Sequence, residues 1–355
     1  MGFRVAIRQA ATAIDVEAGE TILAAALRQG VDYPHGCQSG NCGACKSTLY
    51  AGEVELSPYS DYALSAAERA QGLILACRAV PWSDAEIAWQ DSEEAAVHPR
   101  RTLVCRVADI VQATHDTRIL RLAVDGGGPF DFSAGQYASV TFAGQKPRDY
   151  SMANRPDEAM LEFHIRHMPG GATSAYVAHS LAIGEPATVE GPFGIAHLRE
   201  RHTGPVLAIA GGSGLAPILS ILRTALAKGM GQSMRLFFGV RAERDVYGEA
   251  GLAALAAGHA NFSYEIVLSE PGPGGSRPAG FVHEHAARRL GDLDGARAYL
   301  AGPPVMVEAA TATLAAHGLP RQDIFADAFY TEAERARLDG AAALVAALVQ
   351  GGQDG

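Results

Sequence analysis

The sequence lacks the features that mark secreted and membrane proteins. Its longest apolar stretch, residues 206–222, is interrupted by glycine, serine and proline, so it does not predict a membrane-spanning helix. Two arginines lie within the first ten residues and no apolar stretch follows them, so we expect no secretory signal. These absences predict a cytoplasmic protein.

Cysteine and positive charge are both scarce. The five cysteines are an odd number, so a complete disulfide framework cannot account for all of them. The 29 lysines and arginines are outnumbered by 39 aspartates and glutamates, which gives a net charge of −10. A nucleic-acid backbone needs a basic footprint, so we expect no nucleic-acid partner. Hydrophobic residues make up 48% of the chain, which excludes a largely disordered protein.

The length of 355 residues predicts two or three domains, at about 150 residues per domain. Most of the negative charge falls on the first one, since residues 1–98 hold 6 basic and 13 acidic side chains. A polar acidic stretch ends near residue 97, where we place a boundary. The predicted domains are residues 1–97, 98–203 and 204–330. Residues 331–355 predict an amphipathic helical tail, which either packs on the protein or forms a dimer contact.

Two different hydrophobic patterns follow the first domain. Residues 103–195 consist of short alternating runs separated by glycine and proline, which is typical of an antiparallel β-barrel or sandwich. From residue 204 onward, apolar runs alternate with helical stretches. This alternation predicts an α/β domain with a doubly wound parallel sheet.

Four of the cysteines form a motif. Cys37, Cys42 and Cys45 have C-x4-C-x2-C spacing and Cys77 follows, which matches the ligand set of a plant-type [2Fe–2S] cluster. Small residues surround them, so backbone N–H groups can approach the cluster sulfides. A four-cysteine zinc site is the alternative, but such sites usually pair two C-x2-C knuckles. Cys105 lies outside the motif, and we expect a buried thiol on a strand.

These residues carry a first resemblance. Residues 1–90 resemble a plant-type ferredoxin, which implies an α+β (β-grasp) fold with an opening hairpin and a helix at Thr21–Gln29. Arg148-Asp-Tyr-Ser151 is similar to the R-x-Y-S motif of the ferredoxin–NADP⁺ reductase family. The resemblance implies that Tyr150 stacks on a flavin, that Arg148 binds its phosphate and that Ser151 lies near flavin N5. An Arg–Asp pair beside a core tyrosine is the alternative.

Two further segments support a flavin site on the barrel. Residues 169–174 resemble the family's Gly-Gly-x-x-Ser/Thr segment, where N–H groups at a helix start bind the pyrophosphate. This segment favours FAD over FMN. His164 is a structural histidine or, alternatively, takes part in proton transfer. The flavin-binding residues predicted here are His164, Ile165, Arg166, Gly170, Gly171, Thr173 and Ser174.

The last domain carries the signs of a nicotinamide site. Its first strand leads into Gly211, Gly212, Ser213 and Gly214, which open a helix and allow close approach of a phosphate. The loop departs from the G-x-G-x-x-G fingerprint, so an ordinary strand–helix turn is the alternative. Residues 299–306 resemble the family's C-G-P-P-x-M element, which implies that Gly302, Pro303 and Met306 line the nicotinamide pocket. Ala301 replaces the cysteine that many relatives have there.

An aromatic pair and an arginine complete the predicted site. The resemblance implies that Phe329, with Tyr330, covers the flavin face that nicotinamide must reach, and core packing is the alternative. We therefore predict Tyr150, Ser151 and Phe329 as the catalytic residues. Arg241 is a predicted contact of the dinucleotide. NADH is favoured over NADPH, because the stretch around Arg241 lacks the Ser/Arg pair that usually binds a 2′-phosphate.

As a whole, the chain resembles the reductase components of bacterial multicomponent aromatic oxygenases, and the naphthalene-dioxygenase type most. This implies electron transfer from NADH to FAD, to [2Fe–2S], and then to a Rieske-type ring-hydroxylating dioxygenase or a small ferredoxin. A reductase of a diiron aromatic or alkane monooxygenase is one alternative. A non-catalytic zinc-binding or redox-sensing module is another. We expect no membrane partner and a monomer or weak homodimer, with the acidic first domain docking on a basic acceptor.

Overall fold

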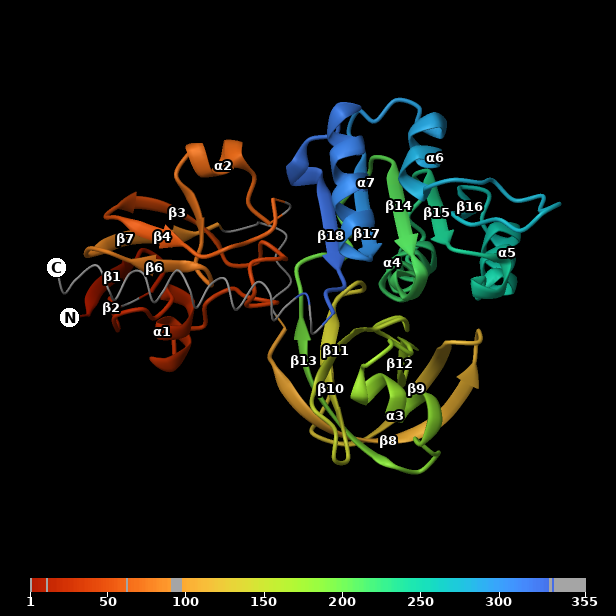
Figure 1. Ribbon diagram of the computed structural model, residues 1–355, viewed down its shortest axis with the longest axis horizontal. Helices are drawn as coiled ribbons and strands as arrows, with labels where there is room; N and C mark the ends of the chain where they lie inside the picture. The colour runs from red at the N-terminus through yellow and green to blue at the C-terminus, as the bar shows by residue number, and fades with distance from the viewer. Residues whose placement is uncertain (1, 11, 62, 91–97, 332–333, 335–355) are drawn as a thin grey trace. The chain divides into compact units, whose positions relative to one another are not determined.

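The computed structural model describes residues 2–10, 12–61, 63–90, 98–331 and 334. The chain forms two compact units (Figure 1): the first comprises Met1–Ala95 and Tyr330–Gly355, and the second comprises Ala96–Phe329. The predicted domains 98–203 and 204–330 both fall largely within the second unit. The tail predicted as a helix lies outside the described residues, apart from Thr331 and Glu334.

The first unit combines a mixed five-stranded sheet, a smaller two-stranded sheet and the helices α1 and α2. Its elements are β1 (Phe3–Ile7), β2 (Ile14–Val16), α1 (Ile22–Arg28), β3 (Lys46–Ala51), β4 (Val54–Leu56), α2 (Ala66–Ala70), β5 (Leu73–Leu75), β6 (Ala79–Pro81) and β7 (Ala85–Trp89). The main sheet has the order β2-β1-β7-β3-β5, with β1 and β7 parallel, and β4 pairs with β6. The predicted opening hairpin and helix are confirmed. The helix begins where the Thr21 hydroxyl accepts the N–H of Ala24.

The second unit begins with an antiparallel barrel that is nearly closed. Its elements are β8 (Arg101–Gln112), β9 (Thr117–Gly126), β10 (Tyr137–Phe142), β11 (Arg148–Ser151), β12 (Met160–Arg166), α3 (Ala172–His179) and β13 (Pro186–Phe193). The strand order is β11-β10-β13-β8-β9-β12, and a bridge between Met152 and Phe163 links its two ends. Alternate residues of β10 are buried, as the period of two requires. Cys105 is buried on β8, as predicted.

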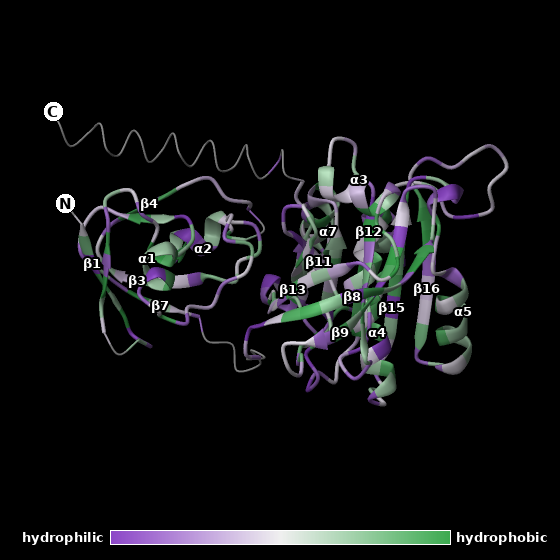
Figure 2. Ribbon diagram, turned by 90° about the horizontal axis from the view of Figure 1, so that it is seen from below, coloured by the Kyte–Doolittle hydropathy of each residue, from purple (hydrophilic) through white to green (hydrophobic). Residues whose placement is uncertain are grey.

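A parallel sheet forms the rest of the second unit. Its elements are β14 (Val206–Gly211), η1 (Gly212–Gly214), α4 (Leu215–Ala227), β15 (Met234–Val240), η2 (Glu243–Asp245), α5 (Glu249–Gly258), β16 (Phe262–Leu268), α6 (Val282–Arg289), β17 (Arg297–Gly302), α7 (Pro304–Ala316), η3 (Arg321–Asp323) and β18 (Ile324–Ala328). The order is β16-β15-β14-β17-β18, so the predicted doubly wound sheet is confirmed. Residues of β15 and α4 are mostly hydrophobic (Figure 2). Every residue of the central strand β14 is buried, since helices cover a parallel sheet on both faces.

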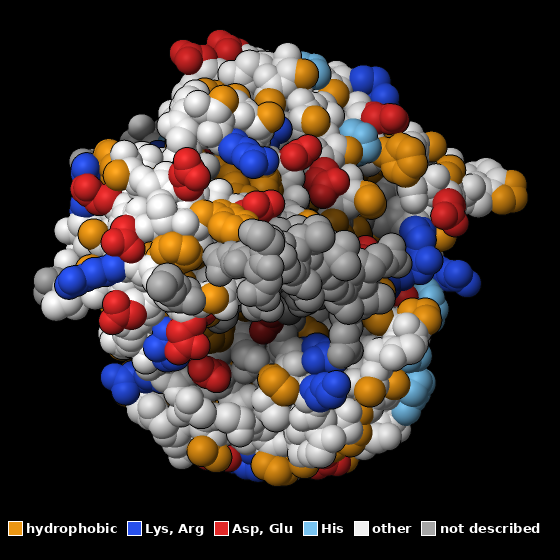
Figure 3. Space-filling model, turned by 60° about the vertical axis from the view of Figure 1, so that its left-hand side comes forward, with side chains coloured by type: hydrophobic (Ala, Val, Ile, Leu, Met, Phe, Trp, Pro, Cys, Tyr) orange, Lys and Arg blue, Asp and Glu red, His pale blue; other side chains and the backbone are white. Residues whose placement is uncertain are grey.

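This topology decides where a ligand can bind. The chain runs outward from β14 to β16 on one side and then continues through β17 and β18 on the other. In open α/β sheets, ligands bind beyond the carboxyl ends of the strands at such a reversal, here next to β14 and β17. Among the described residues, no helix is long and apolar enough to cross a bilayer. On the face drawn in Figure 3, acidic, basic and apolar side chains are interspersed.

Candidate functional site

The four cysteines of the predicted cluster motif come from two segments of the first unit. Cys37, Cys42 and Cys45 lie in the loop between α1 and β3, and Cys77 lies between β5 and β6. Cys45 and Cys77 are each 4% exposed, whereas Cys37 and Cys42 are half-buried. The N–H of Cys77 donates to the Cys45 sulfur at 3.4 Å. The fold thus brings the fourth cysteine of the motif against the loop.

Backbone N–H groups of this loop point at its sulfur atoms. The N–H of Asn41 donates to Cys37 Sγ at 3.2 Å, and the N–H of Cys37 donates to Cys42 Sγ at 3.3 Å. A hydrogen bond from the Cys42 thiol lowers the pKa of Cys37; burial opposes this shift, and the loop N–H groups add to it. N–H donors at the sulfur atoms are what an iron–sulfur centre requires, so this loop fits such a cluster.

Glycine gives the cysteine loop its tight path. Gly40 and Gly43 have φ values of +75° and +73°, in the left-handed region that favours glycine. A Cβ atom at Gly40 would lie 2.9 Å from the Arg78 side chain and from the Cβ of Tyr59. The backbone therefore passes close to its neighbours without a side chain between them.

The predicted flavin motif forms β11, which pairs antiparallel with β10. Side chains alternate along a strand, so Arg148 and Tyr150 share one face of β11 and Ser151 lies on the other, where it is buried. The Tyr150 ring packs against Phe163, with 6.5 Å between ring centroids. Burial raises the pKa of Tyr150 to about 12, so its hydroxyl stays protonated at neutral pH.

Ser151 has a partner that the sequence reasoning missed. Its hydroxyl donates to Asp327 Oδ2 at 2.8 Å, which joins β11 of the barrel to β18 of the parallel sheet. The sequence does show a carboxylate, Asp327, near the end of the last strand and two positions before the predicted aromatic Phe329. It does not show that this carboxylate contacts Ser151.

The predicted pyrophosphate segment forms the start of α3. Gly171 is the N-cap residue and provides no side-chain cap, so the N–H groups of the first turn are left for other acceptors. The Ser174 hydroxyl accepts the N–H of Met168 and donates to the Gly171 carbonyl. The Thr173 hydroxyl donates to the Lys146 carbonyl. These two hydroxyls hold the loop, which leaves the backbone N–H groups as the donors suited to a phosphate.

The three predicted residues of β12 have different surroundings. His164 is buried, with Nδ1 3.1 Å from the Tyr247 hydroxyl and Nε2 3.4 Å from Glu162 Oε1. Both ring nitrogens therefore have protein partners, which favours the structural interpretation of this histidine. Ile165 belongs to the hydrophobic core of the barrel. Arg166 is half-buried and lines the large pocket described next.

A pocket of about 450 Å³ lies at the carboxyl ends of the parallel strands. It is bounded by the loops after β14, β15, β16 and β17 and by the β8–β9 turn. The sequence-predicted residues that line it are Arg166, Gly211, Gly212, Arg241, Pro303 and Met306. The residues that sequence reasoning missed include Asp116, Asp245, Tyr247, Ser269, Phe281 and His283. The size and place of the pocket suit a dinucleotide at the switch point of the sheet.

Three other predicted residues, Ser213, Gly214 and Gly302, are not among those lining the pocket. A Cβ atom at Gly214 would lie 2.1 Å from the Ala301 carbonyl oxygen, and one at Gly302 would lie 2.8 Å from the Gly211 carbonyl oxygen. These glycines let the loop after β14 pack directly against the end of β17. Their role in the structure is to shape the pocket wall.

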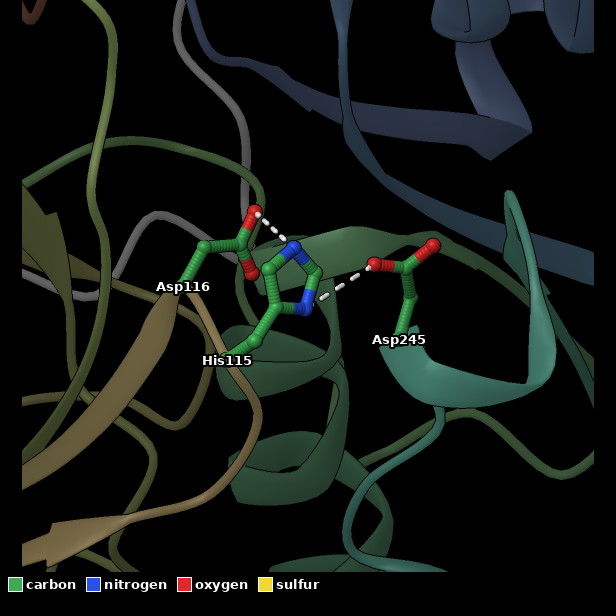
Figure 4. Close-up of side chains that lie close together, drawn as sticks. All are labelled: His115, Asp116 and Asp245. Carbon is green, nitrogen blue, oxygen red and sulfur yellow. Dashed lines mark ion pairs between the residues drawn. The ribbon is translucent and has the colours of Figure 1, made fainter.

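Opposite charges meet on one wall of the pocket. His115 lies between two carboxylates, 3.8 Å from Asp116 and 3.6 Å from Asp245 (Figure 4). Arg166 Nε donates to Asp116 Oδ2 at 2.7 Å, and Arg241 is 3.9 Å from the same oxygen. Burial alone would raise the pKa of Asp116, but hydrogen bonds from Arg166 and Thr114 outweigh it and lower that pKa. Two arginines therefore already pair with Asp116, and its carboxylate is part of an ion-pair network.

Arg277 holds the loop that leads to Phe281 at the pocket. Its guanidinium donates to Glu249 at 2.8 and 2.9 Å and to Glu243 at 3.0 Å. Arg277 lies in a loop rich in glycine and proline that leads to Phe281, which is 60% exposed at the pocket. Since Glu243 begins η2, the guanidinium ties this loop to the segment that carries Asp245.

The predicted aromatic pair directly follows β18. Phe329 belongs to the second unit and Tyr330 to the first. The N–H of Phe329 donates to the Gly302 carbonyl at 2.9 Å. This bond fixes the Phe329 backbone at the end of β17, beside the loop predicted to line the nicotinamide pocket.

Comparison with protein families agrees with this layout. Residues 5–81 match the 2Fe-2S iron-sulfur cluster binding domain, residues 104–198 match the oxidoreductase FAD-binding domain, and residues 208–312 match the oxidoreductase NAD-binding domain. These matches define the class of protein: an oxidoreductase with a [2Fe–2S] cluster, FAD and a nicotinamide dinucleotide, as predicted.

Whole-chain relatives define the family. The chain is 41% identical over 317 residues to the ferredoxin–NAD(P)⁺ reductase component of the naphthalene 1,2-dioxygenase/salicylate 5-hydroxylase systems of Ralstonia, covering 89% of this chain and 95% of that protein. It is 36% identical to the reductase component DmpP of phenol 2-monooxygenase from Pseudomonas, covering 95% and 97%. The crystal structure of Amycolatopsis cytochrome P450 reductase GcoB superposes with a TM-score of 0.73 at 36% identity, covering 92% and 98%. The chain belongs to the family of reductase components of bacterial oxygenase systems.

Proposed function

We propose that this chain is the NADH-dependent reductase of an aromatic ring-hydroxylating dioxygenase of the Rieske type. The observation that carries the proposal is the combination, in one chain, of a four-cysteine loop, the β11 flavin motif and a dinucleotide pocket, with 41% identity to a reductase of a naphthalene dioxygenase system. A nicotinamide gives up two electrons together, whereas iron centres of oxygenases accept them singly. Three cofactor sites in series allow a two-electron donor to supply single electrons to such an acceptor.

We assign the cluster to Cys37, Cys42, Cys45 and Cys77. Two observations support this assignment: N–H groups of the loop donate to the sulfur atoms, and the Cys77 N–H reaches Cys45 from another segment. Zinc would need the same four thiolates, but the family match to a 2Fe-2S binding domain supports iron. The thiolates hold the metal, and the loop N–H groups stabilise the charge on the sulfur atoms.

We assign the flavin to β11 and the start of α3. When bound, flavin supplies the ability to take up a hydride and to release electrons one at a time. Arg148 supplies a planar set of donors for a phosphate, and Tyr150 supplies an aromatic face with a protonated hydroxyl. The Ser151 hydroxyl donates a hydrogen bond to Asp327, which fixes the direction of the lone pairs on the serine oxygen. The residues position the reactants and do not bond to them.

The pocket at the switch point would hold the dinucleotide with its nicotinamide end toward Pro303 and Met306. The glycines after β14 let the backbone approach a phosphate, and Arg166 and Arg241 supply positive charge. Both arginines lie near Asp116, which partly neutralises them. This balance supports NADH over NADPH, because the negative charge of Asp116 would oppose a 2′-phosphate beside these two arginines.

We infer that the acceptor docks on the acidic first unit. Residues 1–98 carry a net charge of −7, so an acceptor with a basic patch would be steered to them. Such docking is transient, and raising the salt concentration should weaken it. A monomer or weak homodimer in the cytoplasm is consistent with this function, since thiolate ligands persist in a reducing compartment.

Replacement of one cluster ligand tests the electron path. Cys42→Ser should leave NADH-driven reduction of a dye at the flavin intact and abolish transfer to a one-electron protein acceptor, because the cluster is the exit. Cys105→Ser, which removes the cysteine outside the motif, should change neither. Undiminished transfer by Cys42→Ser to the protein acceptor would overturn the scheme.

A second acceptor class is favoured by one specific observation. The phenol 2-monooxygenase reductase component matches this chain over 97% of its own length at 36% identity. Reconstitution with a Rieske dioxygenase and with a diiron monooxygenase distinguishes the two acceptors: product should form with the first. An absorption spectrum tests the non-catalytic alternative, since a colourless protein that NADH does not bleach would exclude the reductase.

A further inference from the structure

A buried positive charge lies beside the cysteine loop. Arg78 follows Cys77 directly and is 5% exposed. Among the described residues of the first unit, the other lysines and arginines are exposed or half-buried. Burial of a guanidinium is unfavourable unless the protein compensates for it. A buried arginine in a strongly acidic unit therefore calls for a physical explanation.

The Arg78 side chain reaches across to the loop that holds the first three cysteines. Its Nη2 donates to the Ser39 carbonyl at 2.7 Å, between Cys37 and Cys42 in the sequence. A Cβ atom at Gly40 would lie 2.9 Å from both Cγ and Nε of Arg78, so the side chain lies directly against the Gly40 backbone. The guanidinium thus holds the loop in place from the neighbouring segment that carries Cys77.

The Arg78 backbone is fixed as well. Its N–H donates to the Leu75 carbonyl at 2.8 Å, and its carbonyl accepts the N–H of Ser57 at 2.9 Å. The residue is held at both ends, so the guanidinium has little freedom to leave the loop. The charge is therefore held next to Cys77 in the chain and against the loop that carries the other three proposed ligands.

A positive charge at this place has a consequence for electron transfer. Four thiolates and two sulfides make a [2Fe–2S] cluster negative, and one-electron reduction makes it more so. A nearby cation stabilises the reduced form more than the oxidised form, which raises the reduction potential. Because Arg78 is buried, solvent and salt screen this effect less than they would at the surface.

We propose that Arg78 is a positioning residue for the cluster, which braces the loop through the Ser39 carbonyl and raises the reduction potential of the cluster with its buried charge. This inference rests on the proposed cluster assignment. In the reductase, the higher reduction potential makes the cluster a better acceptor of each single electron that arrives from the flavin. Arg78 itself touches the loop and exchanges no electron or proton.

The test compares the wild-type holoprotein with Arg78→Gln, Arg78→Lys and Arg69→Gln, the last as an exposed arginine of the same unit. Iron content and visible absorption report the cluster, and a redox titration followed by electron paramagnetic resonance gives its midpoint potential. We expect a more negative midpoint in Arg78→Gln, a midpoint near wild type in Arg78→Lys, and no change in Arg69→Gln. NADH-driven dye reduction at the flavin should be the same in all four.

Three results would overturn the proposal. The first is a loaded Arg78→Gln cluster with the wild-type midpoint. The second is an Arg78→Lys midpoint as negative as that of Arg78→Gln, because the retained charge would then have no effect. The third is loss of the cluster from both variants, which would leave Arg78 a purely structural role. Failure of the cluster assignment is distinguishable, since wild type would then show no cluster signal before any variant is compared.

Discussion

The Ser151 hydroxyl and the Asp327 carboxylate, 176 positions apart in the chain, form a hydrogen bond of 2.8 Å. This bond links the flavin motif on β11 to the last strand of the parallel sheet. A serine hydroxyl can rotate freely unless a partner fixes it. The carboxylate therefore sets the orientation of the one hydroxyl that the family resemblance puts near the reacting atom of the flavin.

Removal of either partner should slow hydride uptake. We expect Ser151→Ala and Asp327→Ala each to lower the rate of flavin reduction by NADH about tenfold, because the hydroxyl is lost or loses its orientation. The double variant should be little worse than the single ones, since both changes break the same interaction. Stopped-flow absorbance of the flavin measures the rate. Asp323→Ala, at the residue directly before the same strand, is the control, and a wild-type rate in Asp327→Ala would contradict this role.

The close packing of the loop after β14 gives a second prediction. Gly214→Ala would put a Cβ atom 2.1 Å from the Ala301 carbonyl oxygen, so the pocket wall must shift. We expect a destabilisation on the order of 2 kcal/mol and a higher KM for NADH. Gly231→Ala is the control, because a Cβ atom there meets nothing within 4 Å. Thermal unfolding and steady-state kinetics check both effects, and unchanged values in Gly214→Ala would show that the loop has room.

Arg277 should affect dinucleotide binding without changing the rate of hydride transfer. Arg277→Met removes the hydrogen bonds to Glu243 and Glu249 and frees the loop that leads to Phe281. We expect KM for NADH to rise about fivefold, or ~1 kcal/mol, with kcat nearly unchanged. Arg288→Met, an exposed arginine on α6, is the matched control. A fall in kcat with KM unchanged would assign Arg277 a different role.

A buried histidine predicts how stability depends on pH. Burial, followed by the nearby charge of Arg199, lowers the pKa of His197 to about 3, and the side chain is 4% exposed. An unfolded chain binds this proton near pH 6.5, so between those values the unfolded state holds more protons than the folded state. The contribution is fully present above pH 6.5 and is lost as the pH falls. At pH 5 the loss is about 2 kcal/mol.

His197→Gln should therefore weaken this pH dependence. Between pH 7 and pH 5, the midpoint of the thermal transition that releases flavin should fall less in the variant than in wild type. His179→Gln, which replaces an exposed histidine of α3, should keep the wild-type slope. Equal slopes for His197→Gln and wild type would mean that His197 is protonated in the folded protein at pH 5.

Much of the fold follows from local patterns. The alternation along β10, the continuous apolar run of β14 and the Thr21 cap of α1 are short-range signals, and the structure has the strands and the helix that they predict. The cysteine spacing indicated the cluster for a similar reason, since three of its proposed ligands lie within nine residues of one loop. Such features are determined over a few residues, where sequence order and spatial order agree.

The sequence by itself thus determined the three kinds of cofactor site, because each is built around a short motif of fixed spacing. Only the tertiary structure decided which distant side chains complete them. Asp327 reaches Ser151, Arg166 pairs with Asp116, and Arg78 reaches Ser39 through pairings of strands and loops that no periodicity encodes. Hydrogen bonds and ion pairs of this kind depend on distances of a few ångströms, which only the folded chain sets.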